Sequence, residues 1–146
     1  MPSAIVRLRK LAGSEPVARF LGMELEKLSP GYTKVTMKVK PEHQNFNGMV
    51  FGGIIMALAD QAFAYASNSI VRPNIASQFN IHFLAAPEAG ARLTAEGRVL
   101  KQGRRVGVTE ITVTDEAGTL IARATGTTIP LHDVTPKPGR VQRAKS

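Results

Sequence analysis

The stretch HQNFNGMVFGGIIMALADQAFAYASNSI, residues 43–70, decides the fold of this chain. It begins as a polar loop rich in Asn and Gly and continues as an apolar run in which Asp60 is the only charged residue between Gly53 and Ile70. A run of about 18 residues that is apolar on nearly every side is typical of a helix in a protein core or in a membrane. A carboxylate in the middle of such a helix is costly unless it has a partner or a function. Asp60 is therefore the first candidate for a functional residue.

The polar residues within the run favour a core helix over a membrane span. Asp60, Gln61 and Asn68 interrupt it, and the sequence contains no second run of this kind. A membrane span would carry such groups only at a high cost in free energy. We therefore expect a buried helix wrapped by a sheet, and no membrane partner.

Composition places the chain among ordinary globular proteins. It has 146 residues, of which 43% are hydrophobic and 21% charged, so we expect one domain with a sizeable core. The absence of Cys excludes disulfides, thiolate metal sites and a Cys nucleophile, and the three scattered His have no metal-ligand spacing. The first residues, MPSAIVRLRKLAGSEP, lack the apolar core of a signal peptide, so we expect a cytoplasmic protein.

The formal charge of +8 suits a polyanionic partner, which could be nucleic acid, an anionic membrane or a phosphate-rich small molecule. Aromatic residues make up only 5% of the chain, and no basic patch is interleaved with them. This disfavours nucleic acid, which aromatic side chains bind by stacking. Several basic residues gather near the end of the chain, at Lys137, Arg140, Arg143 and Lys145, and their role stays open.

Before the long helix, the pattern predicts two short helices and a hairpin. Residues 4–13 suit an amphipathic helix, Ser14 suits the N-cap of a second helix, and Gly22 suits its end. The turn dipeptide Pro30-Gly31 then separates two segments, 23–29 and 32–40, that we expect to pair as antiparallel strands.

After the long helix, the pattern predicts four strands. In the first, one face carries Ile75, Phe79, Ile81 and Phe83, and the other carries Gln78, Asn80 and His82. The next three strands are expected at 91–101, 104–114 and 119–129.

The strand at 104–114 has an irregular pattern. In it, Val106 and Val108 are out of phase with Ile111 and Val113, which predicts a bulge near Thr109 and Glu110.

These elements predict an α+β fold in which a curved antiparallel sheet wraps one long central helix. We expect an N-terminal helical segment at 1–22, the sheet-and-helix domain at 23–130, and a basic, disordered tail at 131–146. The sheet would leave free edges and one uncovered face, so we also expect the chain to form a homodimer.

The order of elements resembles the hotdog fold. Within it, residues 47–69 are similar to the phenylacetyl-CoA thioesterase-like branch, in which a polar loop precedes His-Gly-Gly and a helix bearing L-A-D-x-A-x-A-x-A. The later segments IHFLAAP, KQGRR and TGT also fit that branch, and the resemblance covers roughly residues 20–129. It implies an acyl-CoA thioesterase that assembles as a dimer of hotdogs and further as a tetramer. It also implies no cofactor and no metal, because the CoA moiety is part of the substrate.

The resemblance implies roles for individual residues. Asp60 matches the base or nucleophile, the Gly52 N–H matches the oxyanion donor, and Asn45 matches the loop residue that orients water or the thioester. Phe51 departs from the pattern, because it stands where the branch has His. The remaining substrate-binding residues that we expect are Gly53, Asn80, His82 and, near the nucleotide end of CoA, Gly103, Arg104 and Arg105.

The residues themselves agree with this assignment. Gly52 and Gly53 stand at the expected N-terminus of the helix, where backbone N–H groups lack helical partners and the helix dipole is positive. A thioester carbonyl held there would be stabilised as it becomes tetrahedral. Asp60 follows Gly52 by about eight residues, or roughly 12 Å of helix axis. We therefore expect Asp60 to act on the carbonyl that the partner subunit holds, in a site shared across the dimer.

Two other functions remain open. One is a non-catalytic hotdog module that binds or senses acyl-CoA. The other is a hotdog dehydratase or hydratase, which would pair a loop His with the helix acid; His43 and Asp60 offer these residue types, but the spacing and the Asn-Phe-Asn-Gly loop do not match. Asp60 could also be a purely structural carboxylate. The identity of the acyl group is not determined by the sequence.

Overall fold

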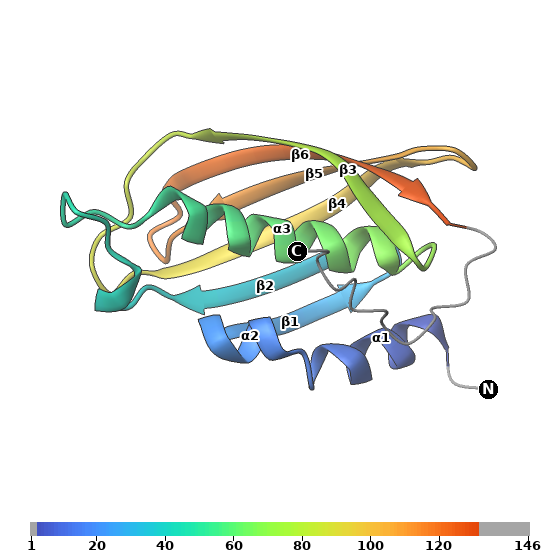
Figure 1. The fold of residues 1–146 in the computed structure, drawn as a ribbon, viewed down its shortest axis with the longest axis horizontal. Helices are drawn as coiled ribbons and strands as arrows, with labels where there is room; N and C mark the ends of the chain where they lie inside the picture. Colours follow the sequence, from blue (N-terminus) through green and yellow to red (C-terminus); the bar gives the residue numbers. More distant parts are fainter. Residues whose placement is uncertain (1–2, 132–146) are drawn as a thin grey trace, which may run out of the picture.

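One long helix, α3 (Gly52–Asn68), lies across the inner face of a curved six-stranded antiparallel sheet (Figure 1). The structure, a computed structural model, describes residues 3–131. The other elements are the helices α1 (Ala4–Ala12) and α2 (Pro16–Leu21), the 3-10 turn η1 (Pro41–His43), and the strands β1 (Met23–Ser29), β2 (Tyr32–Lys38), β3 (Asn74–Phe83), β4 (Arg92–Gln102), β5 (Gly107–Thr114) and β6 (Leu120–Pro130). The predicted α+β architecture is confirmed.

The sheet has the strand order β1-β2-β4-β5-β6-β3, so β1 and β3 form its two edges. The predicted hairpin of β1 and β2 is present, and it turns at Gly31, whose φ of 76° suits glycine. The strand that follows α3 pairs with the last strand of the chain, so β3 runs along an open edge beside the helix. The sheet therefore leaves one long strand available for pairing.

The core forms where α3 meets the inner face of the sheet. Two glycines allow a close approach: a Cβ at Gly97 would lie 2.8 Å from the carbonyl oxygen of Ala62, and a Cβ at Gly126 would lie 2.5 Å from the Phe63 ring. The helix side of this contact is fully apolar, with Ile55, Leu58, Ala59, Ala62, Phe63 and Ala66. Small residues at the contact thus let the helix lie close to the strands.

The prediction for β3 is partly wrong. Phe79 and Ile81 pack against the core, as expected, but Ile75 is 49% exposed and pairs with the outward-facing Ile129. The reason is a register shift between Ala76 and Gln78, which moves the first residues of the strand to the opposite face.

The predicted bulge near Thr109 and Glu110 is also wrong. Strand β5 alternates regularly between buried and partly exposed residues, and Thr109 is on the buried face at 1% exposure. The phase slip in the sequence arises because a threonine faces the core while Val108 faces outward. Register shifts around β5 lie elsewhere: in β4 between Val99 and Lys101, and in the pairing of β5 with β6 between Val113 and Thr114.

The N-terminal helices lie along the β1 edge, and a side chain ties them to α3 (Figure 1). Ser14, the predicted N-cap, is one residue too early: Glu15 holds that position, and its carboxylate turns toward α3 instead of capping the helix. It accepts hydrogen bonds from Gln61 Nε2 at 2.7 Å and from the Tyr65 hydroxyl at 2.7 Å. Burial, and next the hydrogen bond to Glu15, raises the pKa of Tyr65 well above its ordinary value.

From position 132 onward, the predicted disordered tail lies outside the described residues. Among the helices within residues 3–131, none is long and apolar enough to cross a membrane.

We predict that Gly97→Ala lowers the free energy of unfolding by about 2 kcal/mol, because the new methyl group would press on the backbone of α3. The measurement is urea unfolding. Gly13→Ala is the control, since Gly13 has a helical φ of −63° and its added Cβ would come no closer than 3.5 Å to a neighbour. That control should be neutral or stabilise by about 0.5 kcal/mol. Equal effects at both sites would contradict the close approach.

We predict that Glu15→Ala and Tyr65→Phe each destabilise the fold by about 1–2 kcal/mol and that their effects are not additive, because both break the same hydrogen-bonded cluster. A double-mutant cycle of unfolding free energies measures the coupling. Glu24→Ala is the control, because the pair of Glu24 with Arg92 at 3.3 Å is exposed and should contribute about 0.5 kcal/mol or less. Additive effects at Glu15 and Tyr65 would contradict the link.

Candidate active site

The N-terminal tip of α3 offers two free backbone donors. Phe51 is the N-cap residue; its N–H donates to the carbonyl of His43 at 2.8 Å, and its own carbonyl accepts from Ile54 N–H at 2.9 Å. Among residues 3–131, the N–H groups of Gly52 and Gly53 have no acceptor. Free N–H groups at the positive end of a helix are well suited to bind an oxyanion.

The loop before the tip is shaped by Asn45. Its Oδ1 accepts from Asn47 N–H at 2.9 Å and from Met49 N–H at 3.2 Å, and its N–H donates to the Met49 carbonyl at 2.7 Å. The carbonyl side of the amide is thus used to fold the loop. The amide nitrogen has no partner in the part of the chain that the structure describes, so it is the group that Asn45 can offer to a ligand.

His43 is occupied by the protein. It is 6% exposed, and its Nδ1 accepts from Lys40 N–H at 3.0 Å. The imidazole therefore fixes the turn between β2 and the loop.

An apolar hollow of about 310 Å³ opens beside the helix tip. Phe83 forms one wall, and its ring would lie 3.3 Å from a Cβ at Gly52. The lining residues are Met49, Val50, Gly52, Ile55, Phe83, Leu84, Ala85, Ala86 and Pro87. The free N–H of Gly52 thus borders a space that suits an apolar group.

Asp60 lies on the face of α3 that the sheet does not cover. Its neighbours on that face are exposed or half-buried: Gly53, Met56, Ala57 and Ala64. Asp60 itself is exposed in the single chain, yet enough protein surrounds its carboxylate to weaken its hydration. This partial desolvation raises the pKa of Asp60 above its ordinary value, and no charged neighbour contributes to the shift.

Within one chain, Asp60 and Gly52 are two helical turns apart, roughly 12 Å along the axis. Asp60 does not line the hollow at the helix tip. A single chain therefore does not bring the carboxylate and the N–H group to one carbonyl, and the shared site stays a prediction.

The structure does not bring Asn80 and His82 to α3. Because Phe79 faces the helix and contacts Phe63 at 5.6 Å between ring centroids, its neighbours along β3 face the outside of the sheet. There Asn80 and His82 border a polar hollow with Glu110, Arg123 and Thr125. Their predicted contact with substrate would have to involve this outer face.

The turn with Gly103, Arg104 and Arg105 lies at the other end of α3 from Gly52. Gln102, at the end of β4, accepts from Asn74 Nδ2 at 2.9 Å, and the same Asn74 nitrogen donates to the carbonyl of Ser67 near the C-terminus of the helix. Arg104 and Arg105 are exposed there. Their predicted role with CoA therefore concerns a ligand bound near that end.

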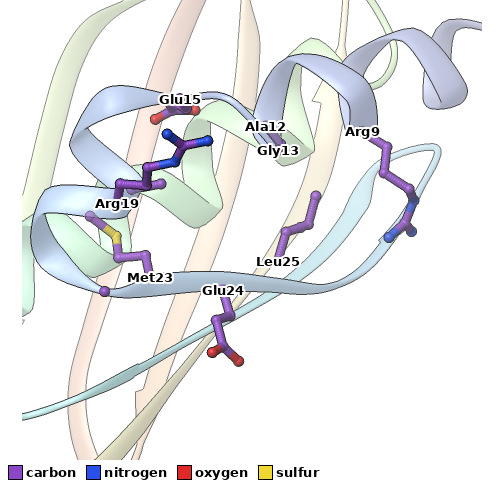
Figure 2. Close-up of a pocket in the computed structure, with 10 residues that line it drawn as sticks. Arg9, Ala12, Gly13, Glu15, Arg19, Met23, Glu24 and Leu25 are labelled. Atoms are coloured by element: carbon purple, nitrogen blue, oxygen red, sulfur yellow. The ribbon is translucent and has the colours of Figure 1, made fainter.

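A larger hollow, of about 480 Å³, lies between the N-terminal helices and β1 (Figure 2). Its lining includes Arg9, Arg19 and Leu25. Glu15 also lines it, and the carboxylate of this residue already accepts a hydrogen bond from α3. It contains none of the predicted site residues. Volume alone therefore does not identify the site in this chain.

Sequence reasoning missed Phe83 as a neighbour of Gly52 and Glu15 as a partner of α3. These pairs are far apart along the chain, so no local pattern indicated them. Among the described residues, no group of three or more His, Asp or Glu side chains could hold a metal ion.

Comparisons with known proteins agree with one another. A profile of the thioesterase superfamily matches residues 47–122, which include the helix tip and Asp60. The acyl-coenzyme A thioesterase PaaI of Escherichia coli is 35% identical over 109 residues, which are 75% of this chain and 78% of PaaI. The structure of E. coli PaaI, from the phenylacetic acid degradation operon, aligns with a TM-score of 0.84 at 31% identity, covering 88% of this chain and 93% of that one. A Streptococcus mutans protein with acetyl CoA bound aligns with a TM-score of 0.71 at 29% identity, covering 73% and 86%.

We predict that Asp60→Asn is more stable than the wild type at neutral pH and that the difference vanishes below about pH 4. Because the pKa of Asp60 is raised in the folded state, the folded protein binds more protons than the unfolded one between the two pKa values. Wild-type stability therefore falls as the pH rises through this interval, and the Asn variant lacks this loss. Urea unfolding as a function of pH measures it, with Glu24→Gln as a control at an exposed carboxylate; identical profiles for wild type and Asp60→Asn would contradict the shift.

Proposed function

Because this chain belongs to the thioesterase superfamily, in its PaaI-like branch, we propose that it hydrolyses acyl-CoA thioesters to a free acid and CoA. The observation that carries the proposal is the pairing of features on α3: free N–H groups at a glycine tip beside an apolar hollow, and a lone carboxylate with a raised pKa on the uncovered face. The acetyl CoA bound to the Streptococcus mutans protein supports an acyl-CoA as the substrate class.

The oxyanion donor is the Gly52 N–H, which is free and lies at the positive end of the helix. When water attacks the thioester carbonyl, negative charge develops on its oxygen, and a donor fixed in place stabilises that charge more than it stabilises the neutral carbonyl. Asn45 supports the same step through its unoccupied amide nitrogen, which would hold the carbonyl or the attacking water.

Asp60 is the general base. Its carboxylate takes a proton from water while the water oxygen bonds to the carbonyl carbon, and the tetrahedral intermediate then expels the CoA thiolate, which takes up a proton. Direct attack by Asp60, giving a mixed anhydride that water hydrolyses, is the variant route. The raised pKa makes this carboxylate a stronger base than an ordinary Asp.

The site is completed by a second copy of the chain. Within one chain the Gly52 donor and the Asp60 carboxylate are separated by about two turns of helix. The uncovered face of α3 and the open edge of β3 lie next to each other, and this part of the surface exposes large apolar side chains, Met56 and Phe83 among them. Pairing of two β3 edges would cover this surface and set the Asp60 of one copy against the glycine tip of the other.

The β4–β5 turn would bind the nucleotide end of CoA. Gly103 has no side chain, so the ligand can approach the backbone of the turn, and Arg104 and Arg105 supply positive charge for the CoA phosphates. Because this turn lies far from the Gly52 of its own chain, it would serve a site completed by another subunit.

The two alternatives differ in what they require. A non-catalytic acyl-CoA module would bind the same ligand without releasing thiol. A dehydratase would need His43 as a catalytic group, but this imidazole is buried and its Nδ1 is engaged by Lys40 N–H, which disfavours that role.

We predict that Asp60→Asn lowers kcat by two to four orders of magnitude, since it removes the base but keeps the shape of the side chain. The measurement is free-thiol release from a set of aryl, short, medium and long acyl-CoAs. In the wild type, kcat/KM should rise with pH through the pKa of Asp60, at a value above the roughly 3.9 of an ordinary Asp. Glu24→Gln is the control and should behave as the wild type. Full activity of Asp60→Asn would refute the mechanism, and saturable binding without any thiol release would favour the binding module.

A further inference from the structure

Asn74, the first residue of β3, joins the sheet to the C-terminal end of α3. Its Nδ2 donates to the carbonyl of Ser67 at 3.2 Å and to Oε1 of Gln102 at 2.9 Å. Asn68, the last residue of α3, holds the backbone of Asn74: its Oδ1 accepts from the Asn74 N–H at 2.9 Å, and its Nδ2 donates to the Asn74 carbonyl at 3.1 Å. Asn74 is therefore fixed to the helix through both its backbone and its side chain.

The side chain of Asn74 is oriented by its two donor contacts. Its Oδ1 is buried and has no hydrogen-bond partner among residues 3–131. Leaving a buried acceptor unpaired costs free energy. With the amide reversed, however, an oxygen would face the oxygens of Ser67 and Gln102. The fold thus accepts this cost, and the amide nitrogen of Asn74 links two elements that are otherwise separate, the end of α3 and the end of β4.

Gln102, the last residue of β4, continues this link into the β4–β5 turn. Its Oε1 accepts from Asn74, and its Nε2 donates to the carbonyl of Gly103 at 2.9 Å. Gly107 leaves room for the side chain, because a Cβ there would lie 2.6 Å from Gln102 Oε1. Hydrogen bonds therefore run from the helix through Asn74 and Gln102 to the residue that directly precedes Arg104.

The turn that this link reaches is exposed and positively charged. It lies at the end of the sheet nearest the C-terminus of α3 (Figure 1). Arg104 and Arg105 are both exposed on it, and the sequence contains no acidic residue between Glu96 and Glu110. A binding group that is held in place beforehand loses less conformational entropy when its ligand binds. The link is therefore placed where it can determine how well these arginines bind an anion.

We propose that Asn74 and Gln102 position the β4–β5 turn for the nucleotide end of the substrate: their hydrogen bonds between α3 and Gly103 hold Arg104 and Arg105 in the orientation that binds the CoA phosphates. This rests on the proposed function and adds to it how the phosphate-binding turn is held. Both residues act through the arginines and not on the thioester, so they are positioning residues. Loss of the link weakens binding of the CoA ester equally in the ground state and in the transition state, which raises KM and leaves kcat unchanged.

The test compares two thioesters of the acyl group that the wild type hydrolyses fastest, the acyl-CoA and the acyl-pantetheine, which lacks the phosphates and the nucleotide. Asn74→Ala and Gln102→Ala should each raise KM for the acyl-CoA about fivefold or more, with kcat within about twofold of the wild type. KM for the acyl-pantetheine should stay unchanged. If Asn74→Ala does not fold, Gln102→Ala gives the same comparison, because the Gln102 side chain is only half-buried.

Two further comparisons show whether the effect passes through the arginines. In a variant that carries both Arg104→Gln and Arg105→Gln, adding Asn74→Ala should change KM for the acyl-CoA little, because the groups that it positions are already gone. Tyr65→Phe is the matched control: it also removes a buried hydrogen bond of α3, but on the side that faces Glu15. Its ratio of the two KM values should match the wild type.

An equal rise of KM for both thioesters in Asn74→Ala and Gln102→Ala, or an equal effect of Tyr65→Phe on the ratio, would reduce the link to a structural contact and overturn the proposal, while the thioesterase function would stand. If the wild type releases no thiol from any ester, the proposed function fails, and calorimetric titration with CoA and with pantetheine decides the positioning role by itself. Weaker CoA binding in Asn74→Ala than in Tyr65→Phe, with pantetheine binding unchanged, would support it. Equal CoA binding in both variants, or no CoA binding by the wild type, would overturn it.

Discussion

The packing of α3 against the inner face of the sheet is the contact on which the rest of the structure depends. Gly97 and Gly126 remove the side chains that would hold the helix away, and the alanines of α3 do the same from the other side. The helix is therefore locked at close range along one face. Asp60, on the opposite face, and Gly52, at the glycine tip, are therefore held in place by a packed helix and do not lie on mobile loops.

The division of α3 into faces explains how an apolar helix can carry polar groups at low cost. Gln61 and Tyr65 point to a third side, where the Glu15 carboxylate satisfies both at 2.7 Å. Asp60 has no such partner among residues 3–131 and remains partly desolvated. The carboxylate of Glu15 is thus hydrogen-bonded within the protein, whereas that of Asp60 is not. A carboxylate left without a partner in the protein is expected where stability is lost in favour of reactivity.

The tip of α3 combines two physical properties that oppose each other in water. Its free N–H groups attract negative charge, while Phe83 and the apolar hollow beside the tip offer no ionisable side chain. Hydrogen bonds to a developing charge are strengthened in such surroundings. In the proposed mechanism the oxyanion donors are backbone N–H groups, so a phenylalanine can stand where the resemblance implies a histidine.

Local sequence patterns predicted much of the fold and the main candidate residues of the site. The apolar run of residues 52–68 specified a core helix, the turn at Gly31 specified a hairpin, and the glycine pair with Asp60 indicated the candidate site, because each depends on residues close together in the chain. Only the tertiary structure decided the rest. The outward turn of Ile75 depends on a register shift against β6, and the inward position of Thr109 depends on its partners in β4 and β6. The contacts of Glu15 with α3 and of Phe83 with Gly52 join segments whose separation along the chain leaves no periodic signal, so they exist only once the sheet has closed around the helix.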